Sequence, residues 1–228
     1  MIIAVTGLRR EARIVTAPGV ETINGGGNSL VLQSKLERAI KEGADGIISI
    51  GIAGGLAPSL RPGDCIIGTE VIIGDERFFS DAAWTARLAA RLPSAMMAAL
   101  TGTDAIILNE AEKAALFRTT GAYAVDMESH VAARLAAAQQ APFAALRIVS
   151  DPADRRLPPL ASTALTSEGR VNYRAVAKAL LKDPRQIPQL MRTARDAKIA
   201  LSTLLRCRNA LGLRLAGPDS REPALDMR

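Results

Sequence analysis

Short apolar runs alternate with segments of helical periodicity along this chain, and this alternation limits the possible folds more than any other feature. Such runs are typical of buried strands, and apolar residues three and four positions apart are typical of helices packed on a sheet. The pattern predicts an α/β domain with helices on a largely parallel sheet. Strands are expected at residues 2–6, 46–52, 64–68, 122–125 and 143–149, and helices at residues 29–41 and 127–140. A further helix is expected between an N-cap at Asn109 and a closing Gly121, and residues 154–163 are expected to form a loop.

Few kinds of side chain are available for chemistry. The 228 residues include one histidine, two cysteines and only 3% aromatic residues, against 48% hydrophobic residues overall. The core must therefore consist of Ala, Leu, Ile and Val, and the length fits one large domain or a fused pair. Structural zinc requires about four His or Cys ligands, so we expect no metal and no cofactor. Catalysis must then come from carboxylates, hydroxyls, Arg and Lys, and nothing in the sequence requires a bridge between Cys65 and Cys207.

The carboxyl-terminal third is strongly basic. Residues 170–214 carry eleven Lys and Arg residues against two Asp residues, within a net charge of +6 for the chain. The periodicity there predicts two consecutive helices. We therefore expect one domain over residues 1–215 that includes this two-helix extension at about 170–214, and a flexible tail over residues 216–228.

The second of these helices is expected to be amphipathic, with one apolar stripe and an adjoining basic face. Such a helix either packs its stripe on the body of the protein or lies in the interface of an anionic membrane. The stripe contains Ile187, Leu190, Met191, Ala194, Leu201 and Leu205, and the basic face contains Arg185, Arg192, Arg195 and Arg206.

No membrane-spanning helix is expected, because the longest apolar run, residues 46–57, is too short and is broken by glycines. The first residues, MIIAVTG, lack the basic region of a signal peptide and are expected to form a strand. Together with the sparse cysteine, these features predict a cytoplasmic protein, with peripheral contact at the inner face of the membrane as the one membrane association considered. We expect no nucleic acid as a partner.

Two motifs place carboxylates where expected strands end. AVDMES carries Asp126 and Glu128, and RIVSDPAD carries Ser150, Asp151 and Asp154. Sheets of this class bind ligands at the carboxyl ends of their strands, so a catalytic role is one interpretation. Each carboxylate also has a structural interpretation, because an acid is favoured in the first turn of a helix and an Asp before a proline commonly caps a turn.

Glycines also cluster where strands are expected to end. Gly51, Gly54 and Gly55 leave a buried strand, and residues 25–27 form a second cluster, but neither fits the spacing of a dinucleotide or nucleoside triphosphate loop. The two clusters indicate either tight turns or a close approach of the backbone to a ligand. For Gly51, Gly54 and Gly55 the close approach is favoured, because the run leaves a buried strand.

Three motifs in this order, GIAGGLAPSLRPGD, AVDMES and RIVSDPAD, resemble the superfamily of purine nucleoside phosphorylases and methylthioadenosine/S-adenosylhomocysteine nucleosidases. The resemblance covers about residues 1–155. It implies a three-layer α/β/α nucleoside phosphorylase-like fold around a mixed, partly barrel-like central sheet. It also implies that the protein is an enzyme that cleaves the N-glycosidic bond of a purine nucleoside.

The resemblance implies roles for both carboxylate motifs. Asp151 falls at the position of the general acid that neutralises the leaving purine, and Ser150 would orient it. Glu128 falls where the family uses a carboxylate to accept hydrogen bonds from the two ribose hydroxyls, and Met127 would pack on the ribose or base.

The resemblance also implies roles for residues near the base, and two further polar residues are interpreted from the sequence alone. Gly54 would let the backbone approach the substrate, and the backbone near Ala105 and Ile106 would discriminate the base, because TGTDAII has no aromatic residue to stack on it. The only histidine, His130, is expected on a helix surface, and Arg147 is expected to support its strand or to pair with a carboxylate.

The acceptor of the ribosyl group is left open between water and phosphate. Nucleosidases of this superfamily carry a water-activating glutamate after the first strand, and Glu11 lies one residue from that register. The same segment could instead cradle phosphate through guanidinium groups and backbone amides. Its candidate residues are Arg9, Arg10, Gly26, Gly27 and Asn28.

Within the superfamily, the GLxxEAR start and the basic extension are most similar to the hopanoid-associated phosphorylases, which are proposed to release adenine from adenosylhopane in hopanoid biosynthesis. The alternatives are a methylthioadenosine/S-adenosylhomocysteine nucleosidase, a purine nucleoside phosphorylase or, from another class, a non-catalytic nucleotide-binding or membrane-surface protein. A homo-oligomer, most simply a dimer, is expected, because active sites of the family are commonly completed by a neighbouring subunit.

Overall fold

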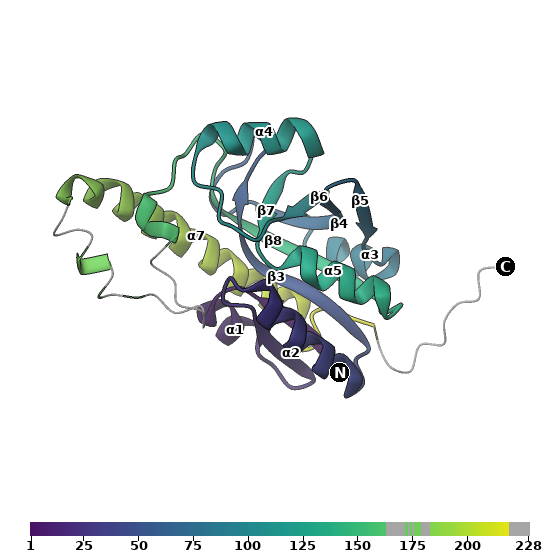
Figure 1. The fold of residues 1–228 in the computed structure, drawn as a ribbon. Helices are drawn as coiled ribbons and strands as arrows, with labels where there is room; N and C mark the ends of the chain where they lie inside the picture. Colours follow the sequence, from purple (N-terminus) through teal and green to yellow (C-terminus); the bar gives the residue numbers. More distant parts are fainter. Residues whose placement is uncertain (163–171, 173, 175, 179–182, 219–228) are drawn as a thin grey trace.

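A computed structural model describes residues 1–162, 172, 174, 176–178 and 183–218 (Figure 1). Its strands are β1 (Ile2–Thr6), β2 (Val20–Asn24), β3 (Gly46–Gly55), β4 (Cys65–Ile73), β5 (Glu76–Phe79), β6 (Met96–Gly102), β7 (Ala124–Asp126) and β8 (Phe143–Asp151). Its α-helices are α1 (Arg9–Val15), α2 (Ser29–Lys41), α3 (Ala82–Arg91), α4 (Glu110–Thr120), α5 (Ser129–Ala138) and α7 (Ile187–Leu211). Short 3₁₀ turns lie at Pro159–Ser162 and Pro184–Gln186.

The strands form one mixed sheet that closes partly on itself. Its order is β2-β1-β3-β7-β6-β4-β5, and β8 pairs with both β3 and β4. Strand β8 is parallel to β3 and antiparallel to β4, so β3, β7, β6, β4 and β8 form a closed ring. The central strands are apolar along almost their whole length because both faces of the sheet are covered.

Helices cover the sheet on two sides. One core cluster joins strand residues to Leu32 and Leu36 of α2 and to Ala132 and Ala136 of α5. The other cluster joins the opposite strand residues to α1, α3 and α7. In Figure 1, α2 and α5 lie in front of the sheet, and the carboxyl-terminal half of α7 passes behind it. This arrangement confirms the predicted α/β/α fold with a mixed central sheet.

The elements expected within residues 1–151 are present, with shifted ends. Asn28 caps α2 by accepting a hydrogen bond from the backbone N–H of Val31. Asn109 caps α4 in the same way, and Gly121 ends it with a φ of 70° that favours glycine. The helix expected from residue 127 begins only at Ser129, which leaves Glu128 as its N-cap residue, outside the regular turns. The cap position frees the Glu128 side chain for the site described below.

The sequence pattern does not predict β2, β5, β6 or α3. Strands β2 and β5 lie at the two ends of the strand order, and every residue of β5 is at least partly exposed, so neither shows a continuous apolar run. Strand β6, with the sequence MMAALTG, is rich in residues that favour helices. Its pairing with β4 and β7 overrides that local preference.

Helix α7 packs through a different face from the expected apolar stripe. Its buried residues are Asp196, Ala200, Thr203, Leu204, Cys207 and Leu211. In contrast, Ile187, Met191 and Leu205 of the stripe are exposed. Of the two alternatives for the stripe, packing on the body holds for Leu201, which lies against the second core cluster, and not for these three residues. The first buried residue of the helix is Asp196, and its amino-terminal part extends beyond the body (Figure 1).

The residues that follow α7 also pack on the body. The indole N–H of Trp84 donates to the carbonyl of Leu215 at 3.0 Å, and Arg87 Nε donates to the carbonyl of Ala216 at 2.9 Å. Residues 216–218, expected in a flexible tail, are thus held against α3. The rest of that tail, and most of the first expected carboxyl-terminal helix, lie outside the described residues.

Two further features concern a disulfide between Cys65 and Cys207 and helices that could cross a membrane. Cys65 of β4 and Cys207 of α7 are buried free thiols whose sulfur atoms lie 3.8 Å apart. Within the described part of the chain, none of the helices combines the length and the apolar character that a membrane crossing requires.

Candidate active site

A cavity of about 160 Å³ opens where the carboxyl ends of several strands meet. Its walls come from the turn after β1, the ends of β3, β7 and β8, and the loop that follows β6. These strand ends lie together because β3 pairs with both β7 and β8. The cavity therefore occupies the position at which α/β sheets bind their ligands.

Most of the sequence-predicted site residues line this cavity. They are Glu11, Gly27, Gly54, Ala105, Ile106, Met127, Glu128, Ser150 and Asp151. The fold thus brings together residues from segments far apart in the sequence, whose chemical roles stay predictions.

Four of the residues considered for phosphate binding are not part of the cavity wall. Arg9 and Arg10 are exposed on α1. Gly26 precedes the wall residue Gly27 without being part of the wall, and the Asn28 side chain is engaged in capping α2. Of that group, the described structure brings only Gly27 to the cavity.

Asp151 ends β8 with its carboxyl group buried, and both of its oxygens have partners. Oδ1 accepts a hydrogen bond from Ser150 Oγ at 2.7 Å, and Oδ2 accepts one from Lys113 Nζ at 2.6 Å. A Cβ at Gly54 would lie 3.2 Å from Oδ2, so glycine gives this carboxyl room. Burial raises the pKa of Asp151, against the opposing effect of the Lys113 charge.

Sequence reasoning does not identify Lys113. The residue lies in α4, within a sequence typical of a solvated helix, yet its side chain is fully buried. Besides Asp151, Nζ donates to the carbonyl oxygens of Pro152 at 2.9 Å and Arg155 at 3.2 Å. No local pattern could predict this contact, since the partners lie about forty residues further along the chain.

Glu128 also lines the cavity, and glycines make space for it. A Cβ at Gly7 would lie 2.7 Å from Glu128 Oε1, and one at Gly25 would lie 3.2 Å from its Cγ. Burial, with the neighbouring Asp126 and Glu11 charges, raises the pKa of Glu128 from 4.5 to about 8 despite the attraction of Arg147. Burial thus favours the protonated form of Glu128 at neutral pH.

Glu11 is buried although it belongs to a short helix at the surface. Its Oε2 accepts hydrogen bonds from the backbone N–H groups of Gly7 and Leu8, and its Oε1 accepts one from that of Ile52 at 2.7 Å. Burial raises its pKa, against these hydrogen bonds and the nearby Arg147. Three backbone donors hold the carboxyl group in one orientation at the cavity wall.

Arg147 of β8 is fully buried beneath these carboxylates. Its guanidinium donates to Asp126 Oδ1 at 3.0 Å and lies 3.8 Å from Glu128 Oε2. It also donates to the hydroxyls of Ser49 and Ser129. This one guanidinium is attracted to the carboxyl groups of both Glu128 and Glu11, and its effect does not cancel the rise in their pKa that burial causes. The sequence-based expectation that Arg147 pairs with a carboxylate is confirmed.

His130 is buried rather than surface-exposed, so the expectation for it is wrong. Its Nε2 lies 3.0 Å from Asp104 Oδ1, and Ser29 Oγ donates to the same carboxylate oxygen. This contact joins the start of α5 to the loop after β6 and to the start of α2. The Ser29 and His130 hydrogen bonds lower the pKa of Asp104.

Solved structures of three nucleoside-cleaving enzymes share this fold. The 5′-methylthioadenosine/S-adenosylhomocysteine nucleosidase of Helicobacter pylori matches with a TM-score of 0.66 at 14% identity, over 92% of this chain and 96% of that chain. Futalosine hydrolase of Helicobacter pylori matches with a TM-score of 0.65 at 14% identity, over 92% of this chain and 96% of that chain. The 5′-methylthioadenosine/S-adenosylhomocysteine nucleosidase of Neisseria meningitidis matches with a TM-score of 0.65 at 18% identity, over 92% of this chain and 96% of that chain. At these identities the likeness confirms the fold alone.

The family assignment comes from the sequence itself. A search of curated proteins found no significant match to this chain. A family model described as the phosphorylase superfamily matches residues 33–183, which is more than half of the chain and includes both Glu128 and Asp151. This match confirms the expected class of enzyme. The chain belongs to the phosphorylase superfamily.

Proposed function

We propose that this protein cleaves the N-glycosidic bond of a purine nucleoside. The observation that carries the proposal is that two buried carboxyl groups from different strand ends, Asp151 and Glu128, line a single cavity. Cleavage builds positive charge on the ribose and negative charge on the departing base. One carboxyl group must therefore donate a proton to the base, and a carboxylate must lie close to the sugar.

Asp151 is the proton donor in this proposal. Its raised pKa lets it hold a proton at a higher pH than an exposed aspartate does. When the bond between ribose C1′ and the base nitrogen breaks, its electron pair goes to the purine. The Asp151 proton then passes to a ring nitrogen of the purine, which leaves a neutral base and an Asp151 carboxylate.

Glu128 is the residue that holds the ribose. A carboxylate can accept hydrogen bonds from two neighbouring hydroxyl groups, and its negative charge favours the cationic sugar of the transition state. Because the pKa of Glu128 is about 8, binding of the ribose must draw the proton away from its carboxyl group. Met127 lines the cavity beside it and offers a thioether surface to the ribose or base.

Water is the acceptor that we propose. Glu11 is held at the cavity wall by three backbone N–H groups, as a residue that removes a proton from water would need to be. None of the described wall residues is Lys or Arg. Phosphorolysis is the competing proposal, and it would require Arg9 or Arg10 to reach the cavity.

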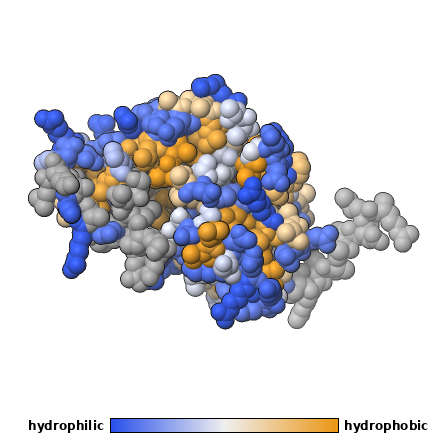
Figure 2. Space-filling model, in the orientation of Figure 1, coloured by the Kyte–Doolittle hydropathy of each residue, from blue (hydrophilic) through white to orange (hydrophobic). Residues whose placement is uncertain are grey.

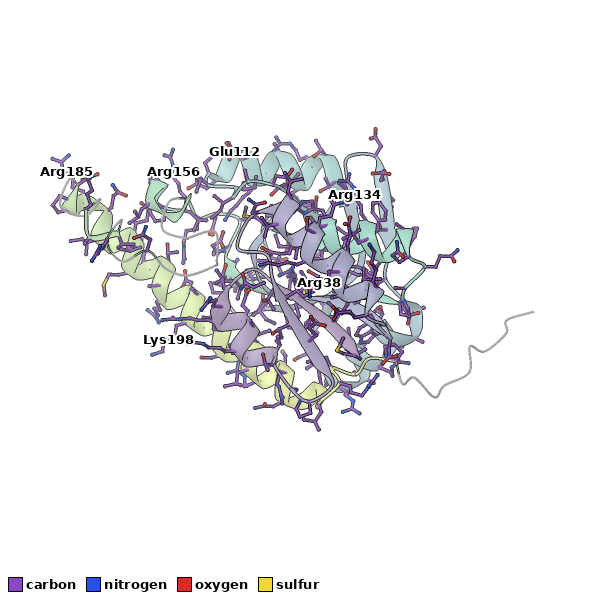
Figure 3. The ribbon with its side chains drawn as sticks, turned by 60° about the horizontal axis from the view of Figure 1, so that its bottom comes forward. Arg38, Glu112, Arg134, Arg156, Arg185 and Lys198 are labelled. Atoms are coloured by element: carbon purple, nitrogen blue, oxygen red, sulfur yellow. The ribbon has the colours of Figure 1, made fainter. Side chains whose placement is uncertain are left out.

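The finer proposal is a lipid-linked substrate, adenosylhopane, from which adenine is released in hopanoid biosynthesis. Apolar side chains gather between α4 and α7 in Figure 2, and Ile187 and Met191 of α7 are 44% and 67% exposed. Lys198 of α7 and Arg185, in the 3₁₀ turn just before it, point away from the body in Figure 3. Such a helix could lie on an anionic leaflet while the adenosine group enters the cavity.

The start of α7 contacts the segment that lines the cavity. Gln189 Nε2 donates to the carbonyl of Arg156 at 2.7 Å, and Arg156 precedes the cavity-lining Leu157. A lipid-bound substrate would thus meet α7 and the cavity together. A methylthioadenosine/S-adenosylhomocysteine nucleosidase and a purine nucleoside phosphorylase are the alternative assignments.

Vesicle binding tests this peripheral, otherwise cytoplasmic, location. The protein should co-sediment with anionic vesicles at low salt and detach as salt screens the charges. Changing four basic residues to Gln should abolish binding but preserve turnover of soluble adenosine analogues. They are Arg185, in the 3₁₀ turn just before α7, and Arg192, Arg195 and Arg206 of α7. A matched variant changes Arg38, Lys41, Arg118 and Arg134, which are exposed on other helices, and should bind as the wild type does. Equal binding to neutral and anionic vesicles, or none to either, would contradict the proposal.

We also propose that the protein is a homodimer. Leu30 and Val31 at the start of α2 are 77% and 41% exposed, close in the chain to the cavity residue Gly27. A symmetric contact through this end of α2 would bury them beside the site. Sedimentation at micromolar concentration should show twice the mass of the 24.1 kDa chain, and Leu30→Glu should lower it. A species of 24.1 kDa alone in the wild type would refute the dimer.

Base release tests the proposed activity. The protein is incubated with adenosine, 5′-methylthioadenosine, S-adenosylhomocysteine and adenosylhopane, each with and without inorganic phosphate, and free adenine is measured. Release without phosphate supports hydrolysis, whereas release that requires phosphate and yields a sugar phosphate supports phosphorolysis. Binding of these nucleosides without release would support a non-catalytic nucleotide-binding protein instead.

A further inference from the structure

The proposed proton donor has a buried cation attached to it. Lys113 is fully buried in α4, and its Nζ lies 2.6 Å from Asp151 Oδ2. An ammonium group has three N–H donors, and the other two acceptors are the carbonyl oxygens of Pro152 and Arg155. Each of these partners is an acceptor, so the surroundings of Nζ fit the charged form of Lys113.

The location of this cation calls for a reason beyond stability. Burying a lysine is costly unless its charge is paired, and apolar side chains can often replace a buried ion pair without loss of stability. Leu116 and Phe117 in the same helix pack against the apolar cluster beneath α4 without any charge. The ammonium group of Lys113 instead pairs with the carboxyl group of Asp151, which lines the cavity.

We propose that Lys113 is a positioning residue for the general acid, which fixes Asp151 Oδ2 and neutralises the carboxylate left after Asp151 has protonated the purine. The inference rests on the proposed function. In the step, the O–H bond of Asp151 breaks, the proton goes to the purine, and Asp151 gains a negative charge. Lys113 keeps its own three protons throughout, and its ammonium attracts the new carboxylate more strongly than the neutral carboxyl group.

The other charged groups around Asp151 act more weakly or lie elsewhere. Arg155, in the loop after β8, lowers the pKa of Asp151 less than Lys113 does, and its guanidinium is paired with Asp196 of α7. Glu128 and Glu11 also line the cavity, but neither is among the groups that shift the pKa of Asp151. Lys113 is therefore the main cation that acts on the proton donor.

This arrangement predicts a change in the pH profile. An opposite charge within about 4–6 Å lowers the pKa of a carboxyl group by about 1 to 3 units, so loss of Lys113 should raise the pKa of Asp151 by that amount. Since Asp151 must be protonated to act, activity falls as the pH rises through its pKa. Without Lys113 this fall should move to higher pH, and the maximal rate should drop by about 100-fold because the product carboxylate is no longer neutralised.

The experiment compares Lys113→Met, Lys113→Gln and Lys113→Arg, with Lys41→Met on the exposed surface of α2 as the control. The pH dependence of kcat/KM is measured with two substrates. One is the best purine nucleoside of the wild type, and the other is 4-nitrophenyl β-D-ribofuranoside, whose leaving group departs as a stable anion without a proton. The Met and Gln variants should lose activity on the purine nucleoside and show the upward shift, but keep most activity on the nitrophenyl riboside. The Arg variant should keep the pH profile of the wild type, and the control should match the wild type throughout.

An unshifted profile in the neutral variants, or a shifted one in Lys113→Arg, would overturn the inference. Equal loss on both substrates would also overturn it, because a purely structural role would lower both rates together. If the neutral variants do not fold, the pH profile of Lys113→Arg decides: the profile of the wild type supports the inference, and a shifted profile overturns it. Failure of the proposed function is distinct, since the wild type itself would then release no purine.

Discussion

The pKa of Glu128 predicts how the stability of the ligand-free protein depends on pH. Burial raises this pKa from 4.5 to about 8, so between these values the folded chain holds a proton that the unfolded chain has lost. The stabilisation from this group is complete below the unfolded pKa and is lost as the pH rises through the folded pKa. The free energy of unfolding should therefore fall as the pH rises over this range.

The magnitude follows from linkage. One proton held only by the folded state changes the free energy of unfolding by about 1.4 kcal/mol per pH unit, so Glu128 contributes a loss of about 2.7 kcal/mol between pH 5.5 and 7.5. For a chain of this size, that loss corresponds to a decrease in Tm of about 5 to 10 °C. Glu128→Gln, which cannot ionise, should lack this part of the decrease.

Thermal unfolding of the two proteins at several pH values measures the difference directly. The Tm of the wild type should fall more steeply with pH than that of Glu128→Gln, so the two lines should diverge toward high pH. Glu112→Gln is the matched control, because Glu112 is exposed on α4 and points outward (Figure 3). Parallel lines for wild type and Glu128→Gln would refute the account of a buried, proton-holding Glu128.

Three further predictions concern the same cavity. Glu11→Gln should lower hydrolysis by about 10²- to 10⁴-fold in a base-release assay, and activity restored by phosphate would contradict the role of Glu11 with water. Gly51→Ala should lower both Tm and activity, because its Cβ would lie 2.6 Å from Glu11 Oε1 and 2.9 Å from Arg147 Nη1; an unchanged Tm would show that this packing can relax. Calorimetry with a non-hydrolysable nucleoside analogue should show affinity rising as the pH increases toward 8, because Glu128 must ionise to accept both ribose hydroxyls, and the same pH dependence in Glu128→Gln would contradict this.

Sequence reasoning predicts the fold where local pattern and tertiary packing agree. The apolar strands β3 and β8 are buried on both faces, and their continuous apolar runs are visible in the sequence. Strand β6 is invisible because its Met and Ala residues favour helices, and only its pairing partners make it a strand. In α7, the apolar spacing indicates a face, but the helix packs through small and polar positions further along, such as Ala200 and Thr203.

The site residues also differ in whether a local sequence motif or only a tertiary contact reveals them. Asp151 and Glu128 belong to short motifs at strand ends, so the sequence locates them without the structure. Lys113 has no such motif, because its function depends on a contact between α4 and the end of β8 that only the folded chain creates. Glu11 is intermediate: its segment is recognisable, but only the backbone donors of Gly7, Leu8 and Ile52 show where its carboxyl group lies.

The most direct test of the central claim is the rate of adenine release by the wild type and by Asp151→Asn, measured with saturating adenosine-type nucleoside. The wild type should release free adenine, and Asp151→Asn should do so about 10²- to 10⁴-fold more slowly, because an amide cannot donate the proton that the departing base requires. Circular dichroism must show that the variant is folded. Equal rates in the two proteins would contradict the assignment of Asp151 as the general acid, and no release of base by the wild type from any purine nucleoside would contradict the account as a whole.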